Sequence, residues 1–107
     1  MTAVTTHVLD TARGLPAAGV GVVLEAWEDG GWRPLATAAT DDDGRAADLA
    51  AVDAGPGVHR LVFATGEYLG AGAFFPEVTV VIELRGEERL HVPLLLAPHG
   101  YTTYRGS

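Results

Sequence analysis

The feature that most restricts the fold of this chain is a series of short segments in which apolar and polar side chains alternate. Such alternation places one face of an extended strand in a core and leaves the other face exposed. Turns rich in Gly, Pro and Asp separate the segments every ~8–12 residues, a spacing typical of a β-sandwich or barrel. A chain of 107 residues has the size of one domain. We therefore expect an all-β protein, with a single domain over residues 1–107.

The alternation predicts about seven or eight short strands. Their expected ranges are 2–10, 20–28, 32–40, 58–65, 77–85, 89–96 and 101–105, with a further short stretch over 45–49. Asp29, Gly30 and Gly31 predict a hairpin turn between the second and third strands, because glycine readily takes the positive φ that such turns require. Tyr68 and Leu69 lie in a glycine-flanked segment that has room for one helical turn.

Composition excludes several classes of function. Fourteen acidic residues against seven basic ones give a net charge of −7, whereas nucleic acids and anionic membranes require a basic surface. All the basic residues are arginine, so no lysine is present to form a Schiff base. No cysteine is present either, which excludes disulfides, thiolate nucleophiles and thiolate metal ligands. We expect no nucleic-acid or membrane partner.

The expected location is the cytoplasm. The first residues lack the basic region and apolar core of a signal peptide. No apolar run approaches the ~20 residues that a membrane-spanning helix needs.

Histidine is the remaining side chain that can move protons near neutral pH. His91 lies on the face of its strand opposite the leucines, where it is either a half-exposed strand residue or part of a site. Pro93 beside it predicts an edge strand or a bulge, because proline cannot donate a backbone hydrogen bond. His7 lies near the end of the first strand, and as a surface residue it would be placed to pair with Asp10. We interpret His59 as structural or solvated.

His99 is interpreted as an ordinary turn residue. The histidines show no close pair with the spacing of zinc ligands. We therefore expect no metal site and no cofactor.

Arg45 and the carboxyl-terminal tail complete the candidates. Arg45 follows an acidic turn, so it either pairs with that turn at the surface or presents its guanidinium to an anionic or carbonyl-rich planar substrate. Ser107 lacks the strained Gly-x-Ser-x-Gly turn that activates a serine nucleophile, and it suits hydrogen bonding better. By residue type alone, these side chains suit cofactor-free hydrolysis or isomerisation of a small polar substrate.

Five segments carry a resemblance to a known family. They are Thr6-His7-Val8-Leu9-Asp10, Asp43-Gly44-Arg45, Phe74-Phe75-Pro76-Glu77-Val78, His91-Val92-Pro93-Leu94-Leu95-Leu96 and Tyr101-Thr102-Thr103-Tyr104-Arg105-Gly106-Ser107. Together they resemble the transthyretin-like 5-hydroxyisourate hydrolases, and the resemblance extends from about Thr5 to the last residue. The ending Tyr-Arg-Gly-Ser distinguishes these hydrolases from transthyretin, a thyroid-hormone carrier with the same fold.

The resemblance implies a transthyretin-like β-sandwich of two four-stranded sheets with one short helix. It also implies a homotetramer, built as a dimer of dimers, with active sites in the channel between the dimers. The implied reaction is hydrolysis of 5-hydroxyisourate to 2-oxo-4-hydroxy-4-carboxy-5-ureidoimidazoline in urate degradation. Carried over to this sequence, the catalytic residues are His7, Arg45 and His91. The implied substrate-binding residues of the tail are Tyr104, Arg105, Gly106 and Ser107.

This chain departs from the family pattern at Ala97 and His99, where serine and an aromatic residue usually flank the proline. We expect a small effect on how the tail is anchored or on substrate selectivity.

Two other functions stay open at the level of sequence. A non-catalytic carrier of small ligands would have the same fold, but an apolar channel. An immunoglobulin-like interaction module would scatter these polar residues over its surface.

Overall fold

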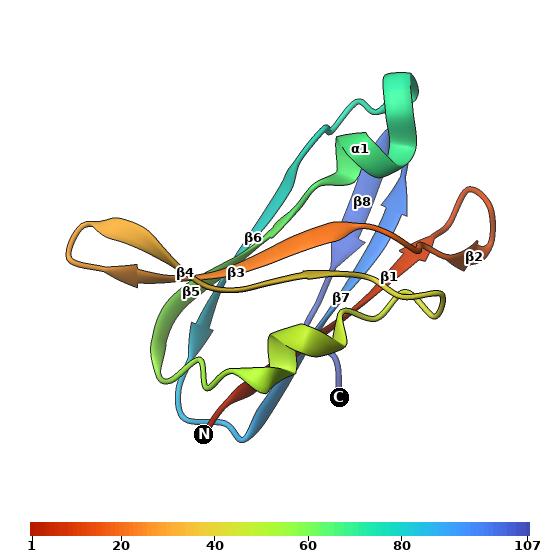
Figure 1. The fold of residues 1–107 in the computed structure, drawn as a ribbon. Coiled ribbons are helices and arrows are strands. Elements are labelled where there is room, and N and C mark those ends of the chain that lie inside the picture. Colours follow the sequence, from red (N-terminus) through yellow and green to blue (C-terminus); the bar gives the residue numbers. More distant parts are fainter.

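The computed structural model describes all residues, 1–107, as two four-stranded sheets packed face to face (Figure 1). The first sheet has the order β2-β1-β7-β8. Its strands are β1 (Ala3–Asp10), β2 (Leu15–Pro16), β7 (Arg89–Ala97) and β8 (Gly100–Thr103). The second sheet has the order β4-β3-β5-β6. Its strands are β3 (Gly21–Glu28), β4 (Gly31–Ala39), β5 (Gly57–Phe63) and β6 (Val78–Leu84).

Helical structure is limited to three short segments. One is the α-helix α1 (Thr65–Leu69), and the others are the 3₁₀ segments η1 (Ala47–Ala51) and η2 (Gly70–Gly72). No helix is long and apolar enough to cross a membrane. The predicted sandwich of two four-stranded sheets with one short helix is confirmed.

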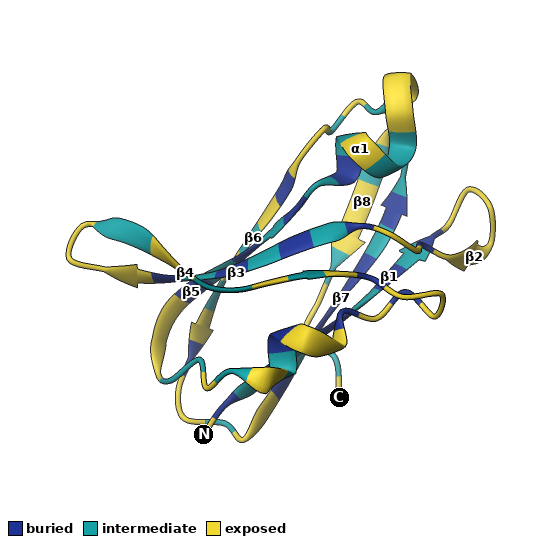
Figure 2. Ribbon diagram, viewed as in Figure 1, coloured by how far each residue is buried: buried dark blue, intermediate teal, exposed yellow.

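The core lies between the two sheets, as the alternation in sequence predicts. Buried and partly exposed residues alternate along β1 and along most of β3, and this banding is visible in Figure 2. One cluster of 16 buried hydrophobic residues joins the sheets and includes the fully buried Leu24, Leu61 and Leu94. The inner faces of β1 and β7 are thus committed to the core, so their outer faces are free to carry other residues.

The predicted hairpin turn joins β3 and β4. Asp29 has a φ of 51° and Gly30 a φ of 79°, and positive φ at both central residues is characteristic of a type I′ turn. The rings of Trp27 and Trp32 meet edge to face across this hairpin, with centroids 5.1 Å apart. The local signal from aspartate and glycine was therefore sufficient to locate this turn.

Pro93 lies in the interior of a sheet, so of the two predicted alternatives, an edge strand or a bulge, the edge strand is wrong. Strand β7 lies between β1, to which it is parallel, and β8, to which it is antiparallel. The proline is tolerated because β8 ends at Thr103, opposite Leu94. Beyond that point the ladder between β7 and β8 is interrupted. No carbonyl group of β8 therefore lies opposite Pro93 and requires the N–H that proline lacks. This interruption also ends the last strand at Thr103 instead of the predicted residue 105.

His59 is a core residue, which agrees with the structural half of its interpretation. It is buried at the start of β5. Its Nε2 atom lies 2.7 Å from the carbonyl oxygen of Ala54, and its Nδ1 atom lies 3.0 Å from that of Gly57. This histidine holds the loop that precedes β5 in place and does not line the polar cavity on the first sheet.

Candidate active site

The candidate site lies on the outer face of the first sheet. In the parallel pair of β1 and β7, Thr5 lies opposite His91 and His7 lies opposite Pro93. Residues in register on neighbouring strands share a face of the sheet. Their sequence neighbours on β1, such as Thr6, are buried. Thr5, His7 and His91 therefore point away from the core.

The acidic turn before Arg45 positions His7. An isolated antiparallel bridge links His7 to Arg45, and the backbone N–H of Val8 donates to the carbonyl of Gly44 at 2.7 Å. Gly44 has a φ of 79°, and a Cβ atom there would lie 2.3 Å from the Val8 carbonyl oxygen and 3.2 Å from Cδ2 of His7. Only glycine can bring this turn so close to the imidazole.

A carbonyl oxygen fixes the tautomer of His7. The Nε2 atom of His7 lies 2.7 Å from the carbonyl oxygen of Asp43. A carbonyl oxygen can only accept, so Nε2 carries the hydrogen in this contact. In the neutral ring, Nδ1 is then the atom with a free lone pair.

The acidic turn binds the backbone of Arg45 and not its side chain. Asp41 accepts hydrogen bonds on Oδ1 from the backbone N–H groups of Asp43, at 2.9 Å, and Arg45, at 3.0 Å. The bond from Arg45 is the main reason that the pKa of Asp41 lies below its ordinary value. Arg45 forms no ion pair. The acidic turn therefore holds the backbone and leaves the guanidinium free.

His91 is oriented by Thr5. Its Nδ1 atom lies 2.8 Å from the Thr5 hydroxyl, and this hydroxyl makes a longer bond of 3.4 Å to the carbonyl oxygen of Leu90. Because the hydroxyl donates to the carbonyl, it accepts from Nδ1–H of the imidazole. This arrangement leaves the lone pair on Nε2 of His91.

The surroundings of His91 favour its neutral form. Burial is the main reason that its pKa lies below the ordinary value, and the positive charges of Arg45, His7 and Arg89 lower it further. A neutral imidazole with a fixed tautomer can accept a proton near neutral pH.

The tail packs directly against His91. The pairs Leu94–Thr103 and His91–Gly106 share one antiparallel register, so the tail follows β7 past the gap at Pro93. The backbone N–H of Gly106 donates to the carbonyl of His91 at 2.8 Å. A Cβ atom on Gly106 would lie 2.6 Å from Cδ2 of His91. The tail therefore covers part of the imidazole and needs glycine to do so.

Three of the seven predicted site residues, Arg45, His91 and Ser107, line one open cavity of about 250 Å³, which no hydrophobic residue lines. It is lined by Thr5, Arg45, Arg89, His91 and Ser107. His7 does not line this cavity, but its backbone pairs with that of Arg45, which does. Such convergence of residues from three distant parts of the chain does not fit the scattered polar surface of an interaction module.

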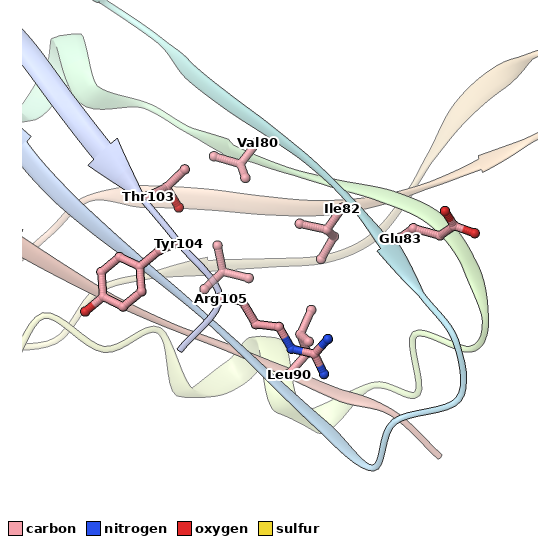
Figure 3. Close-up of a pocket in the computed structure, with 8 residues that line it drawn as sticks. Val80, Ile82, Glu83, Leu90, Thr103, Tyr104 and Arg105 are labelled. Carbon is pink, nitrogen blue, oxygen red and sulfur yellow. The ribbon is translucent and has the colours of Figure 1, made fainter. Parts of the chain in front are cut away.

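Tyr104 and Arg105 lie at a different place. They line a more apolar cavity of about 300 Å³ at the edge of the sandwich, with Val80, Ile82 and Leu90 (Figure 3). An Nη2 atom of Arg105 lies 3.6 Å from Oε2 of Glu87, which ties the tail to the turn before β7. Of the four predicted tail residues, Ser107 lines the polar cavity and Gly106 bonds to His91, whereas Tyr104 and Arg105 line the apolar cavity.

Sequence reasoning missed Thr5 and Arg89. A signal was present, because Arg89 precedes His91 by two positions and therefore shares its face of the strand. Thr5 is two positions before His7 for the same reason. The pairing of His7 with Asp10 is not found: Asp10 instead accepts from the Tyr68 hydroxyl at 2.8 Å.

His99 is exposed in the turn between β7 and β8 and does not line the polar cavity. No group of three or more His, Cys, Asp or Glu side chains is arranged to hold a metal ion.

The fold and the outer-face site define a transthyretin-like sandwich with a polar, histidine-containing site. A sequence model described as the HIUase/Transthyretin family matches residues 4–106. The chain belongs to this family.

Among relatives, the chain is 47% identical over 106 residues to a 5-hydroxyisourate hydrolase of Salmonella dublin, covering 94% of this chain and 78% of that protein. It is also 47% identical over 120 residues to the uric acid degradation bifunctional protein TTL of Arabidopsis thaliana. That match covers 97% of this chain but only 37% of the bifunctional protein, so this chain corresponds to one part of it.

Two solved structures show the same fold. The 5-hydroxyisourate hydrolase of Klebsiella pneumoniae has a TM-score of 0.86 at 34% identity, with all of both chains covered. Sea bream transthyretin in complex with thyroxine has a TM-score of 0.87 at 30% identity, with 96% of this chain and 93% of that chain covered. The fold alone thus does not separate an enzyme from a carrier, and the site must decide.

Proposed function

We propose that this protein hydrolyses 5-hydroxyisourate to 2-oxo-4-hydroxy-4-carboxy-5-ureidoimidazoline, a step of urate degradation. The observation that carries the proposal is the convergence of Arg45, His91 and Ser107 on one polar cavity. The relatives named as 5-hydroxyisourate hydrolases support it, because their similarity covers nearly the whole chain.

In the proposed mechanism, His91 is the general base. Its Nε2 atom takes a proton from a water molecule, and the resulting hydroxide adds to the carbonyl carbon of a ring amide. The negative charge that develops on the carbonyl oxygen is stabilised by the Arg45 guanidinium. The C–N bond then breaks, and the imidazolium returns its proton to the leaving nitrogen. Water is thereby divided between the new carboxyl group and the released nitrogen.

His7 and the tail assist this reaction in different ways. The free lone pair of His7 is on Nδ1, which makes it a second proton acceptor beside the cavity. Gly106 holds the His91 ring, and Ser107 offers its hydroxyl and terminal carboxylate as hydrogen-bonding groups. Tyr104 and Arg105 serve by anchoring the tail instead of touching the substrate.

A non-catalytic carrier is the alternative, and the sea bream transthyretin bound to thyroxine is its example. A carrier for an aromatic or apolar ligand needs an apolar lining. The cavity around His91 has no hydrophobic lining residue, which favours hydrolysis.

We also propose that the chain acts as a single domain over residues 1–107, within a homotetramer that is a dimer of dimers. The site lies on an open sheet face, and a facing copy would turn it into an enclosed channel. The small-molecule substrate is then the principal partner. A cytoplasmic location stays a prediction.

The proposal is tested by generating 5-hydroxyisourate from urate in situ and following its ultraviolet decay with and without the protein. We expect clear acceleration by the wild type and a loss of roughly 10²–10⁴-fold in His91→Ala, the usual contribution of a general base. His99→Ala is the matched control, since His99 is an exposed turn residue, and it should retain full activity.

Two outcomes would contradict the proposal. A wild-type protein that leaves the decay rate unchanged is not this hydrolase, and the carrier alternative would then be preferred. Near-normal turnover in His91→Ala would refute the assignment of the base while leaving the activity in place.

A further inference from the structure

The arginines of this chain are distributed unevenly between ion pairs and the candidate site. Four of the seven arginines form ion pairs with glutamates: Arg33, Arg60, Arg85 and Arg105. The other three are Arg13, Arg45 and Arg89. Acidic residues outnumber arginines by two to one, so an unpaired arginine is not explained by a shortage of carboxylates.

Two of these three unpaired arginines, Arg45 and Arg89, line the same cavity. No Asp or Glu side chain lines it. Two guanidinium groups without an acidic side chain leave the cavity with an excess of positive charge within a protein of net charge −7. Keeping like charges together costs free energy unless an anion is bound between them. This arrangement is suited to an anionic ligand.

The two arginines reach the cavity from different segments of the chain. Arg45 follows the acidic turn and bridges to His7 along β1. Arg89 begins β7, opposite Ala3 of β1 and two positions before His91. A ligand against His91 can therefore meet two guanidinium groups from separate parts of the chain, which neither arginine provides alone.

We propose that Arg89 is a second anion-binding residue of the site, which holds a negatively charged oxygen of the substrate that Arg45 does not reach. This inference rests on the proposed hydrolysis and specifies the substrate class further, as a planar anion bound between two guanidinium groups. Hydrolysis of a ring amide places negative charge on the former carbonyl oxygen, first in the tetrahedral intermediate and then in the product carboxylate. Arg45 stabilises this oxygen, and Arg89 binds a separate, peripheral oxygen of the planar anion in both substrate and intermediate.

Arg89 also acts on His91. The charged and titratable groups that act on this imidazole are Arg45, His7 and Arg89, and Ser107 lines the same cavity. Among the causes that lower the pKa of His91, burial comes first, and the charge of Arg89 adds to those of Arg45 and His7. A nearby positive charge disfavours the imidazolium. Removing the charge of Arg89 should therefore raise the pKa of His91 and make the acidic limb of the pH profile appear at higher pH.

The test compares Arg89→Gln with Arg33→Gln, an exposed arginine of the β3–β4 hairpin. A hydrogen bond to a charged group contributes about 1.5–3 kcal/mol, so Arg89→Gln should raise KM roughly 10- to 100-fold. Binding that is equal in ground and transition states changes KM and leaves kcat nearly unchanged. Arg89→Lys should recover part of the loss, and Arg33→Gln should behave as wild type.

Two measurements keep this test independent of hydrolysis. Titration of the His91 imidazole by NMR, without substrate, should give a higher pKa in Arg89→Gln than in wild type or Arg33→Gln. Calorimetry with urate, a planar anion, should show binding that is weakened at least tenfold in Arg89→Gln.

The outcomes separate the two proposals. If the wild type does not hydrolyse 5-hydroxyisourate but Arg89→Gln still weakens urate binding and raises the pKa of His91, the anion site stands and the hydrolase proposal fails. If Arg89→Gln leaves KM, urate affinity and the His91 titration unchanged, the role of Arg89 is refuted whatever the activity. A lower kcat with unchanged KM and unchanged urate affinity also refutes it.

Discussion

At the scale of single residues, the two site histidines are held in opposite tautomers by neutral partners. The Asp43 carbonyl oxygen requires the hydrogen of His7 on Nε2, 2.7 Å away. The Thr5 hydroxyl, 2.8 Å from Nδ1 of His91, leaves the lone pair of that ring on Nε2. A histidine can act as a base only through the nitrogen that lacks a hydrogen. The partners of each ring therefore decide which atom does the chemistry.

Thr5→Val should lower kcat without unfolding the protein. Valine has nearly the shape of threonine but cannot accept from Nδ1–H of His91, so the tautomer is no longer fixed. One ordinary hydrogen bond contributes about 1 kcal/mol, which corresponds to a roughly fivefold loss of kcat. Steady-state kinetics measure this loss, and NMR of the imidazole nitrogens reports the tautomer of His91.

Thr5→Ser keeps the hydroxyl and should retain activity and tautomer. The role assigned to Thr5 would be incorrect if valine left kcat and the imidazole spectrum unchanged, or if serine lost as much activity as valine.

At the scale of elements, the tail is an extension of the first sheet beyond the end of β8. Thr103 donates its hydroxyl to the Pro93 carbonyl at 2.7 Å, and the backbone of Gly106 returns to His91 three residues later. Proline lacks the N–H that a continuous ladder would use. The interruption separates β8 from the site-lining end of the tail while keeping both in one register.

Gly106→Ala should reduce activity far more than stability. The added methyl would lie 2.6 Å from Cδ2 of His91 and 3.2 Å from Cγ of Pro93, so either the imidazole or the tail must move. A misplacement of about 1 Å can cost on the order of 10²-fold in rate. Kinetics and thermal unfolding measure the two effects separately.

Gly100→Ala is the control in the same part of the chain, because a Cβ atom there has nothing within 4 Å. It should leave both activity and melting temperature close to wild type. Wild-type turnover in Gly106→Ala would show that the tail does not position His91.

At the scale of the whole molecule, one side of the sandwich exposes two unpaired strand edges. β6 and β8 are the edge strands of their sheets, and the apolar cavity with Val80 and Ile82 lies beside β6 and the chain that follows β8. Val81 is 60% exposed and Tyr104 is 55% exposed. Unpaired edges of this kind favour pairing with another chain. The separate polar cavity lies on the outer face of the first sheet, where a second type of contact would enclose it.

The assembly should therefore have a mass of about four times the 11.2 kDa of one chain. Native mass spectrometry and light scattering at the protein concentration of the activity assay measure it. Val81→Glu would place a charge at the exposed edge of β6 and should shift the assembly toward smaller species, whereas Trp27→Gln on the β3–β4 hairpin should not. A fully active monomer would refute both the tetramer and the need to enclose the site.

The sequence by itself determined the class of fold and supplied the candidates for the site. Alternation in β1 and in the strand of His91 fixes which face is buried, and Asp29 with Gly30 fixes a hairpin, because these signals act between residues close in the chain. Histidine and arginine in a chain without cysteine or lysine limited the chemistry to proton transfer and charge stabilisation. The family resemblance added His7, Arg45, His91 and the tail as a set.

Only the tertiary structure decided which of these residues meet. The parallel pairing of β1 with β7 brings Thr5 to His91, although 86 positions separate them in the chain. It also places Pro93 in the interior of a sheet, contrary to the local rule, because the neighbouring strand ends where its N–H would be needed. Arg89 became a site residue because it lines the same cavity as Arg45 and His91. Strand pairing over such distances depends on packing across the whole sheet, which no local pattern of residues specifies.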